Sequence, residues 1–103
     1  MPEDELVDRC REWAEERSLE IVVVFDGTAP GGLVGERELD KRGIVAGTGR
    51  EESADDWLIR TASRYAGEQR SYWLVTSDRA LRNAAGAAAE RTIGGGRFLR
   101  ELL

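Results

Sequence analysis

One apolar run constrains the fold of this chain more than any other stretch: Ile21-Val-Val-Val-Phe25, followed at once by Asp26 and Gly27. A short run rich in β-branched residues and bounded by turn residues is typical of a strand buried on both faces. Such strands belong mostly to parallel sheets covered by helices. A second run of the same form, residues 72–77, precedes Asp78. Because open α/β sheets bind ligands at the carboxyl ends of their strands, both aspartates are predicted to lie where chemistry is usually placed.

Along the whole sequence, helix-type patterns alternate with strand-type patterns. Helical spacing of apolar residues predicts helices over residues 3–17, 53–66, 78–85 and 97–103, and short apolar runs predict strands at 21–26, 44–46 and 72–77. Residues 84–91 fit either a continued alanine-rich helix or a turn at Gly86 followed by a strand at about 88–93. The glycine-rich residues 27–43 are expected to form a surface loop with at most one helical turn. This alternation predicts a single α/β domain over residues 1–103, with a mostly parallel sheet.

Composition excludes several classes of function. The net charge of −5 argues against broad, nonspecific nucleic-acid binding but leaves room for a local basic patch. With no histidine, Ser-His and Cys-His catalysis and histidine-ligated metal sites are excluded. The single cysteine, Cys10, cannot form an intrachain disulfide and fits a reducing compartment, so a cytoplasmic location is expected. No apolar run approaches the roughly 20 residues that a membrane span requires, and no membrane association is expected.

Three acidic residues are predicted to meet at one rim of the sheet. Asp26 and Asp78 end strands, and Asp55 lies in the first turn of a helix that begins just past a strand end. Clustered carboxylates repel each other unless a cation joins them, and Mg²⁺ or Mn²⁺ is the natural partner for oxygen ligands. Each residue also has a structural interpretation: Asp26-Gly27 as a turn, Asp55 as a helix-dipole partner, and Asp78 as the N-cap of the next helix.

Next to this rim lie residues suited to a phosphate. Thr76 and Ser77 carry hydroxyl groups that can hydrogen-bond a phosphate or orient the neighbouring carboxylate. Arg79 carries a guanidinium that can pair with a substrate phosphate or with neighbours of Asp78. A Ser nucleophile is not expected, because no base accompanies it.

Taken together, these segments resemble the NYN domain, and within it the YacP-like branch of the PIN-fold ribonucleases. The resemblance is carried by Val-Val-Phe-Asp26-Gly27, by Glu52-Ser-Ala-Asp55-Asp56-Trp-Leu-Ile, by Leu-Val-Thr-Ser-Asp78-Arg79-Ala-Leu, by the turn Gly86-Ala87 and by a terminal Arg-Phe98-Leu helix. It implies a three-layer α/β/α PIN-like domain, and it favours the strand at 88–93 over a continued helix.

The resemblance also implies a function. Asp26, Asp55 and Asp78 match the acidic positions of a Mg²⁺- or Mn²⁺-dependent endoribonuclease, and Thr76, Ser77 and Arg79 match the surrounding motif that binds substrate. The implied partner is single-stranded RNA, with association with the ribosome as one option. A different class of function, a phosphoacceptor domain of receiver type, is disfavoured. Such a domain is expected to have a lysine at a strand end, whereas Lys41, the one lysine, lies in the loop.

One departure from the family bears on activity. Family members begin with a central strand that ends in Asp-Gly-Tyr-Asn and supplies the first catalytic aspartate, whereas residues 1–17 here match the helix that follows that strand. The predicted fold therefore lacks the family's first strand, and a truncated product or a natural short form both fit. Two functions follow as alternatives: a metal-dependent endoribonuclease, or a catalytically impaired domain that binds RNA or protein. Unpaired strand edges next to the missing strand also raise the expectation of a homodimer.

Overall fold

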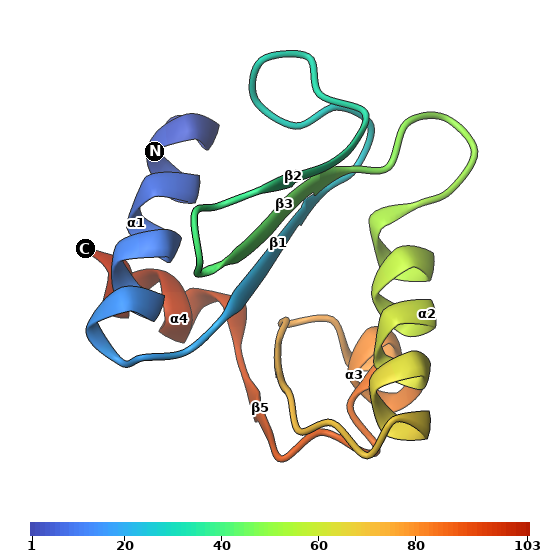
Figure 1. The fold of residues 1–103 in the computed structure, drawn as a ribbon. Helices are drawn as coiled ribbons and strands as arrows, with labels where there is room; N and C mark the ends of the chain where they lie inside the picture. The colour runs from blue at the N-terminus through green and yellow to red at the C-terminus, as the bar shows by residue number, and fades with distance from the viewer. The chain divides into compact units, whose positions relative to one another are not determined.

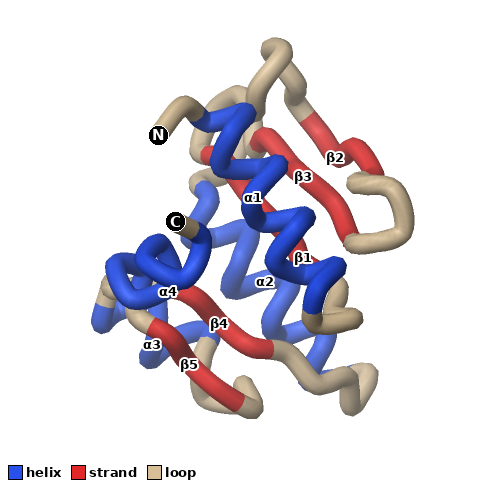
Figure 2. Tube along the Cα trace, turned by 90° about the vertical axis from the view of Figure 1, so that its left-hand side faces the viewer, coloured by secondary structure: helices blue, strands red, loops and turns tan.

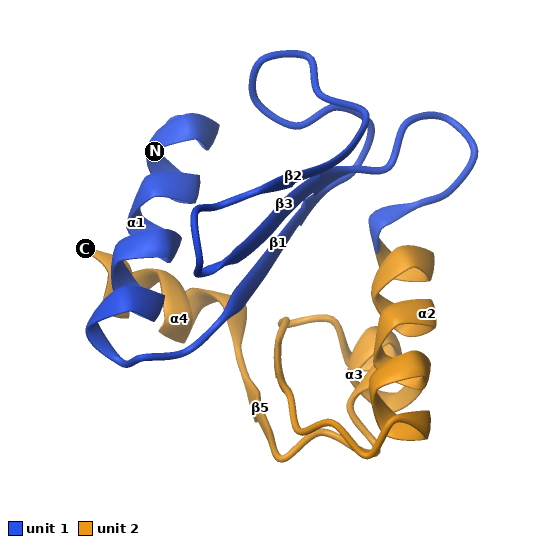
Figure 3. Ribbon diagram, viewed as in Figure 1, with its two compact units in different colours: residues 1–54 blue, residues 55–103 orange.

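The computed structural model describes all residues from 1 to 103, in four helices and five strands (Figure 1). In chain order these are α1 (Glu3–Glu16), β1 (Ile21–Phe25), β2 (Gly35–Glu38), β3 (Gly43–Gly47), α2 (Ala54–Gly67), β4 (Trp73–Val75), α3 (Arg79–Ala85), β5 (Arg91–Ile93) and α4 (Gly95–Leu102). The chain divides into two compact units, residues 1–54 (unit 1) and residues 55–103 (unit 2), which Figure 3 colours separately. The mixed α/β class predicted from the sequence is confirmed.

The sheet of unit 1 has the strand order β1-β3-β2. β1 and β3 run parallel, with Ile21 opposite Gly43 and Phe25 opposite Gly47. The helix α1 has Val7 among the buried residues that form a core with Val45 of β3. The apolar stripe on α1 is thus buried, as its helical spacing predicts. The prediction that β1 is buried on both faces is wrong: all five of its residues are only partly buried, and β1 pairs with a strand on one side only.

Residues 27–43 differ from the prediction, because they contain a strand rather than only a loop. β2 pairs antiparallel with β3, with Glu36 opposite Ala46 and Glu38 opposite Ile44. Every residue of β2 is exposed, so its sequence, Gly-Glu-Arg-Glu, carries no apolar alternation that could reveal a strand. Its charged residues are typical of an edge strand that avoids further pairing.

Gly43, at the start of β3, is required by the close approach of two strands. Its φ is +137°, and a Cβ atom at this position would overlap the backbone carbonyl of Ile21. A residue other than glycine would therefore meet both backbone strain and a clash. The β1–β3 pairing consequently depends on this glycine.

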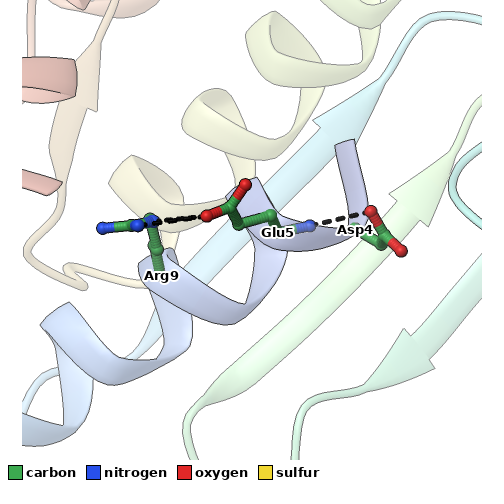
Figure 4. A network of polar contacts seen from close by, with 3 residues as sticks. All are labelled: Asp4, Glu5 and Arg9. Atoms are coloured by element: carbon green, nitrogen blue, oxygen red, sulfur yellow. Dashed lines mark hydrogen bonds and ion pairs between the residues drawn. The ribbon is translucent and has the colours of Figure 1, made fainter. Parts of the chain in front are cut away.

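The first turn of α1 carries acidic residues at the positive end of the helix dipole. Asp4 accepts a hydrogen bond from the backbone N–H of Glu5, and Glu5 pairs with Arg9 one turn later at 3.0 Å (Figure 4). An exposed i, i+4 pair of this kind contributes about 0.3–0.5 kcal/mol, so the helix depends mainly on its packed apolar face.

Unit 2 is built on a two-stranded parallel sheet, with Leu74 of β4 opposite Thr92 of β5 (Figure 2). Leu74 lies in a core with Ala62 of α2 and with Leu81 and Ala85 of α3. The Tyr72 hydroxyl donates a 2.6 Å hydrogen bond to the carbonyl oxygen of Ala85, which ties α3 to the start of β4. The strand at 88–93 is confirmed in part, because β5 covers only Arg91–Ile93.

The strands fall into two sheets rather than one. β1 pairs only with β3, and β4 pairs only with β5, so each of these apolar strands lies at the edge of its sheet. None of the four helices has both the length and the apolar character that crossing a bilayer requires.

Candidate active site

Asp26 follows β1 directly and is held there by the turn it begins. Its carboxylate oxygen Oδ1 accepts a 2.9 Å hydrogen bond from the backbone N–H of Ala54, the first residue of α2. Gly27 continues the turn with φ +81°, donates its N–H to the Thr48 hydroxyl at 3.1 Å, and accepts the N–H of Gly49 at 2.7 Å. The predicted turn is therefore present, and it directs the Asp26 side chain toward the start of α2.

Asp55 is the second residue of α2 and is exposed. A carboxylate in the first turn of a helix is stabilised by the helix dipole. No hydrogen bond or ion pair holds the Asp55 side chain in the structure, so its two oxygens are available to a ligand. Of the three predicted metal ligands, Asp55 is the one with no visible role in holding the fold together.

Asp78 serves as the N-cap of α3. Its φ and ψ are extended, and its Oδ1 accepts a 2.9 Å hydrogen bond from the backbone N–H of Leu81. The capping interpretation of this residue is thus confirmed. The second carboxylate oxygen takes no part in the cap, and the side chain is exposed, so capping does not exclude an additional ligand.

The two hydroxyl residues before Asp78 also form backbone hydrogen bonds. The Thr76 hydroxyl accepts the N–H of Asp78 at 3.1 Å, and the Ser77 hydroxyl accepts the N–H of Gly95 at 2.9 Å. Each hydroxyl keeps its own proton for donation to another acceptor. Arg79 is exposed and forms no ion pair, so its guanidinium is available to an anion.

The contact with Gly95 was missed at the sequence level. The sequence predicts that the last helix begins at Arg97, whereas α4 begins at Gly95, so its first two residues are glycines. Glycine has a low helix propensity and therefore gave no signal of helix at these positions. The N-cap residue, Gly94, offers no side chain, and the Ser77 hydroxyl satisfies one of the free N–H groups at this helix start instead.

The donor set fits a hard cation by its chemistry, since all three residues offer carboxylate oxygens. Asp26 belongs to unit 1, whereas Asp55 and Asp78 belong to unit 2. The structure contains no group of three or more acidic or cysteine side chains that could hold a metal ion. The metal site formed by these three residues therefore stays a prediction.

The remaining nucleophile of the chain lies elsewhere. Cys10, on α1, is buried at 4% exposure, and burial raises the pKa of its thiol to about 11. A thiol with a raised pKa is a poor nucleophile at neutral pH, because the thiolate is the reactive form. Cys10 is thus a structural residue of the core and not a catalytic one.

Comparison with known proteins identifies the family. The model of the YacP-like NYN domain matches residues 3–102, nearly the whole chain. No curated protein and no solved structure matches the sequence. NYN domains have a PIN-like α/β fold, in agreement with the alternating helices and strands found here. With this match over nearly its full length, the chain belongs to the YacP-like NYN domain family, whose members are nuclease-like domains that act in RNA-related processes.

Proposed function

We propose that this chain is an endoribonuclease-type domain that hydrolyses RNA phosphodiester bonds, with Mg²⁺ or Mn²⁺ held by Asp26, Asp55 and Asp78. One observation carries the proposal: the acidic residues follow strands that run in parallel pairs. Asp26 comes directly after β1, and Asp78 follows β4 after two residues. The carboxyl ends of parallel strands are where α/β folds place their ligands. Family membership supports RNA as the substrate class.

The three aspartates would bind the divalent ion, while other residues would bind the RNA. A bound divalent ion would supply activation of water and stabilisation of charge on a phosphoryl oxygen. Asp26 and Asp78 are each oriented by a capping hydrogen bond to one oxygen, which leaves the other oxygen for the ion. Asp55 contributes a carboxylate that nothing else engages.

The phosphodiester would be bound by the residues that flank Asp78. The Thr76 and Ser77 hydroxyls each accept a backbone N–H, so their own protons are left to donate to phosphate oxygens. Arg79, exposed in the first turn of α3, can donate two parallel N–H bonds to a phosphate. These three residues would orient the phosphate for attack and offset its charge.

A cleavage assay with Asp78→Asn tests the proposal. The wild-type chain is expected to cleave labelled single-stranded RNA in the presence of Mn²⁺, and the variant is expected to lose that activity while it keeps the helix cap. Mn²⁺-stimulated cleavage that survives Asp78→Asn would exclude the proposed site.

A second candidate function is an RNA- or protein-binding domain of the same family without catalysis. The capping bonds of Asp26 and Asp78 favour it, because they give both carboxylates a structural reason to be present. Calorimetric titration separates the two functions. Binding of Mn²⁺ or Mg²⁺ below millimolar concentration, lost in Asp55→Asn, favours the nuclease, and no binding at millimolar concentration favours the non-catalytic form.

A homodimer, a ribosomal association and a cytoplasmic location are further proposals. The edge position of β1 supports the first. Ile21 and Phe25 bond to the β3 side, so the alternate residues Val22 and Val24 point their backbone polar groups toward the edge that no strand of this sheet pairs. An apolar strand edge with unpaired backbone groups favours association with another chain. Strictly monomeric elution in light scattering at micromolar concentration would refute the dimer.

A further inference from the structure

We infer that the exposed face of the β4–β5 sheet is a stacking platform on which Trp73 and Arg91 hold a base of single-stranded RNA. The inference rests on the proposed action on RNA and assigns a binding surface apart from the acidic residues. It starts from the position of Trp73, the most exposed of the three tryptophans, at 38% against 8% for Trp13 and 7% for Trp57.

The strand β4 separates an inner face from an outer one. Leu74 points into the core of unit 2, at 5% exposure, and successive residues of a strand point to opposite faces. Trp73 and Val75 therefore share the other face, and both are more than one third exposed. Leaving a tryptophan exposed forgoes much of the stabilisation that its burial would give, so its exposure in a strand calls for a reason other than packing.

The Trp73 ring is held in a fixed orientation. Its indole N–H donates to Oε2 of Glu90 at 3.1 Å, and the same oxygen accepts the hydroxyl of Ser71 at 2.9 Å. Arg91, the register partner of Trp73 on β5, places its guanidinium carbon 5.2 Å from the ring centroid. A ring fixed before binding loses little conformational entropy when a base stacks against it.

The chemistry of this face suits a nucleotide. A base stacks on an aromatic ring whatever its sequence, and an adjacent arginine can stack as well or neutralise the phosphate. Only an unpaired strand offers free base faces, because the bases of a duplex stack on one another.

The distribution of charge between the two units also favours RNA binding by the unit that contains Trp73. Residues 55–103 contain eight arginines and six acidic residues, for a net charge of +2, whereas residues 1–54 contain seven basic and fourteen acidic residues, for a net charge of −7. The unit that carries Trp73 is therefore the one complementary to a polyanion.

Binding of fluorescein-labelled oligo(U), measured by anisotropy in EDTA so that no cleavage occurs, tests the inference. Trp73→Leu is expected to weaken binding about tenfold, since a stacked base is worth about that or more, and Arg91→Ala is expected to weaken it severalfold. Arg60→Ala is the matched control, because Arg60 lies over the ring of the buried Trp57 and its loss removes the same charge. The intrinsic tryptophan fluorescence of the wild-type chain provides a second readout: because Trp13 and Trp57 are buried, Trp73 is the tryptophan that oligo(U) can reach, so oligo(U) is expected to quench part of the emission, and an RNA duplex of equal length is not.

The outcomes separate this inference from the proposed nuclease function. If oligo(U) binds the wild type and Trp73→Leu equally, or if Arg60→Ala weakens binding as much as Arg91→Ala, the stacking platform is refuted while Mn²⁺-dependent cleavage can still be observed. If the wild-type chain binds no oligo(U) and shows no quenching, the platform is also refuted. If Trp73→Leu fails to fold, Arg91→Ala and the quenching measurement decide.

Discussion

Asp78 allows the helix cap and the proposed ion site to be tested separately. Its Oδ1 accepts the N–H of Leu81 at 2.9 Å, at the start of the seven-residue helix α3. Replacing an aspartate N-cap by alanine costs about 0.5–2 kcal/mol, whereas asparagine caps about as well. We expect Asp78→Ala to lower the free energy of unfolding by about 1 kcal/mol. Asp78→Asn should lower it by at most about 0.5 kcal/mol, because only the interaction of the charge with the helix dipole is lost at an exposed position.

Urea denaturation followed by circular dichroism measures both changes, and thermal unfolding gives a parallel reading in which 1 kcal/mol corresponds to a shift of about 4–6 °C for a chain of this size. Both variants are expected to lose Mn²⁺-stimulated cleavage, since neither retains the carboxylate. The free energy of unfolding would then depend on whether residue 78 can cap α3, whereas cleavage would depend on its negative charge. If Asp78→Ala is as stable as the wild type, the capping role of Asp78 is refuted. If Asp78→Asn is as unstable as Asp78→Ala, asparagine does not replace aspartate as the cap here, and the effects of the cap and of the charge cannot be separated in this way.

Three further residues, Gly43, Thr61 and Cys10, allow tests of the structure within each unit. Gly43→Ala is expected to destabilise the chain by about 3 kcal/mol or more in urea denaturation, because a Cβ atom there overlaps the Ile21 carbonyl at a positive φ; a loss below about 1 kcal/mol would contradict the strand register. Thr61→Val is expected to stabilise it by about 1 kcal/mol, because the buried Thr61 hydroxyl has no hydrogen-bond partner; a loss of stability would indicate a hidden partner. Cys10 is expected to react slowly with iodoacetamide at pH 8 and quickly in urea. Because its folded pKa is raised to about 11, the stability it contributes is present below pH 9 and is lost as the pH rises toward 11; a Cys10→Ala variant with the same decline would show that other groups cause it.

Much of the fold could be predicted because the local residue pattern agrees with the element that forms there. The run 21–26 was recognised by its β-branched residues, and the structure places it in a parallel pair with β3. α3 was predicted to begin after Asp78, and its cap has the expected geometry. In each case the residues that form the element also carry the signal that identifies it.

The elements that were missed owe their structure to contacts distant in sequence. β2 has exposed, charged residues and is a strand only because β3 pairs with it. The glycine-rich start of α4 lacks helix propensity and is supported by the Ser77 hydroxyl, eighteen residues earlier. The exposure of Trp73 could not be read from an apolar run that predicts a buried strand. The candidate site residues lie at strand ends and helix starts as expected, but residue spacing does not encode the distances between them, and the structure contains no group of three carboxylates that could hold an ion.

The most direct test of the central claim uses Asp55, whose side chain forms no hydrogen bond or ion pair and whose charge interacts only with the dipole of α2. Mn²⁺-dependent cleavage of labelled single-stranded RNA should be measured for the wild type, for Asp55→Asn and for the control Glu51→Gln. The control removes an equal negative charge from Glu51, which lies in an exposed turn four residues before Asp55. We predict that the wild type and Glu51→Gln cleave alike and that Asp55→Asn does not cleave, while Asp55→Asn loses at most about 0.5 kcal/mol of stability in urea denaturation, because only the interaction of its charge with the helix dipole is removed. Undiminished cleavage by Asp55→Asn would contradict an acidic site that includes this residue.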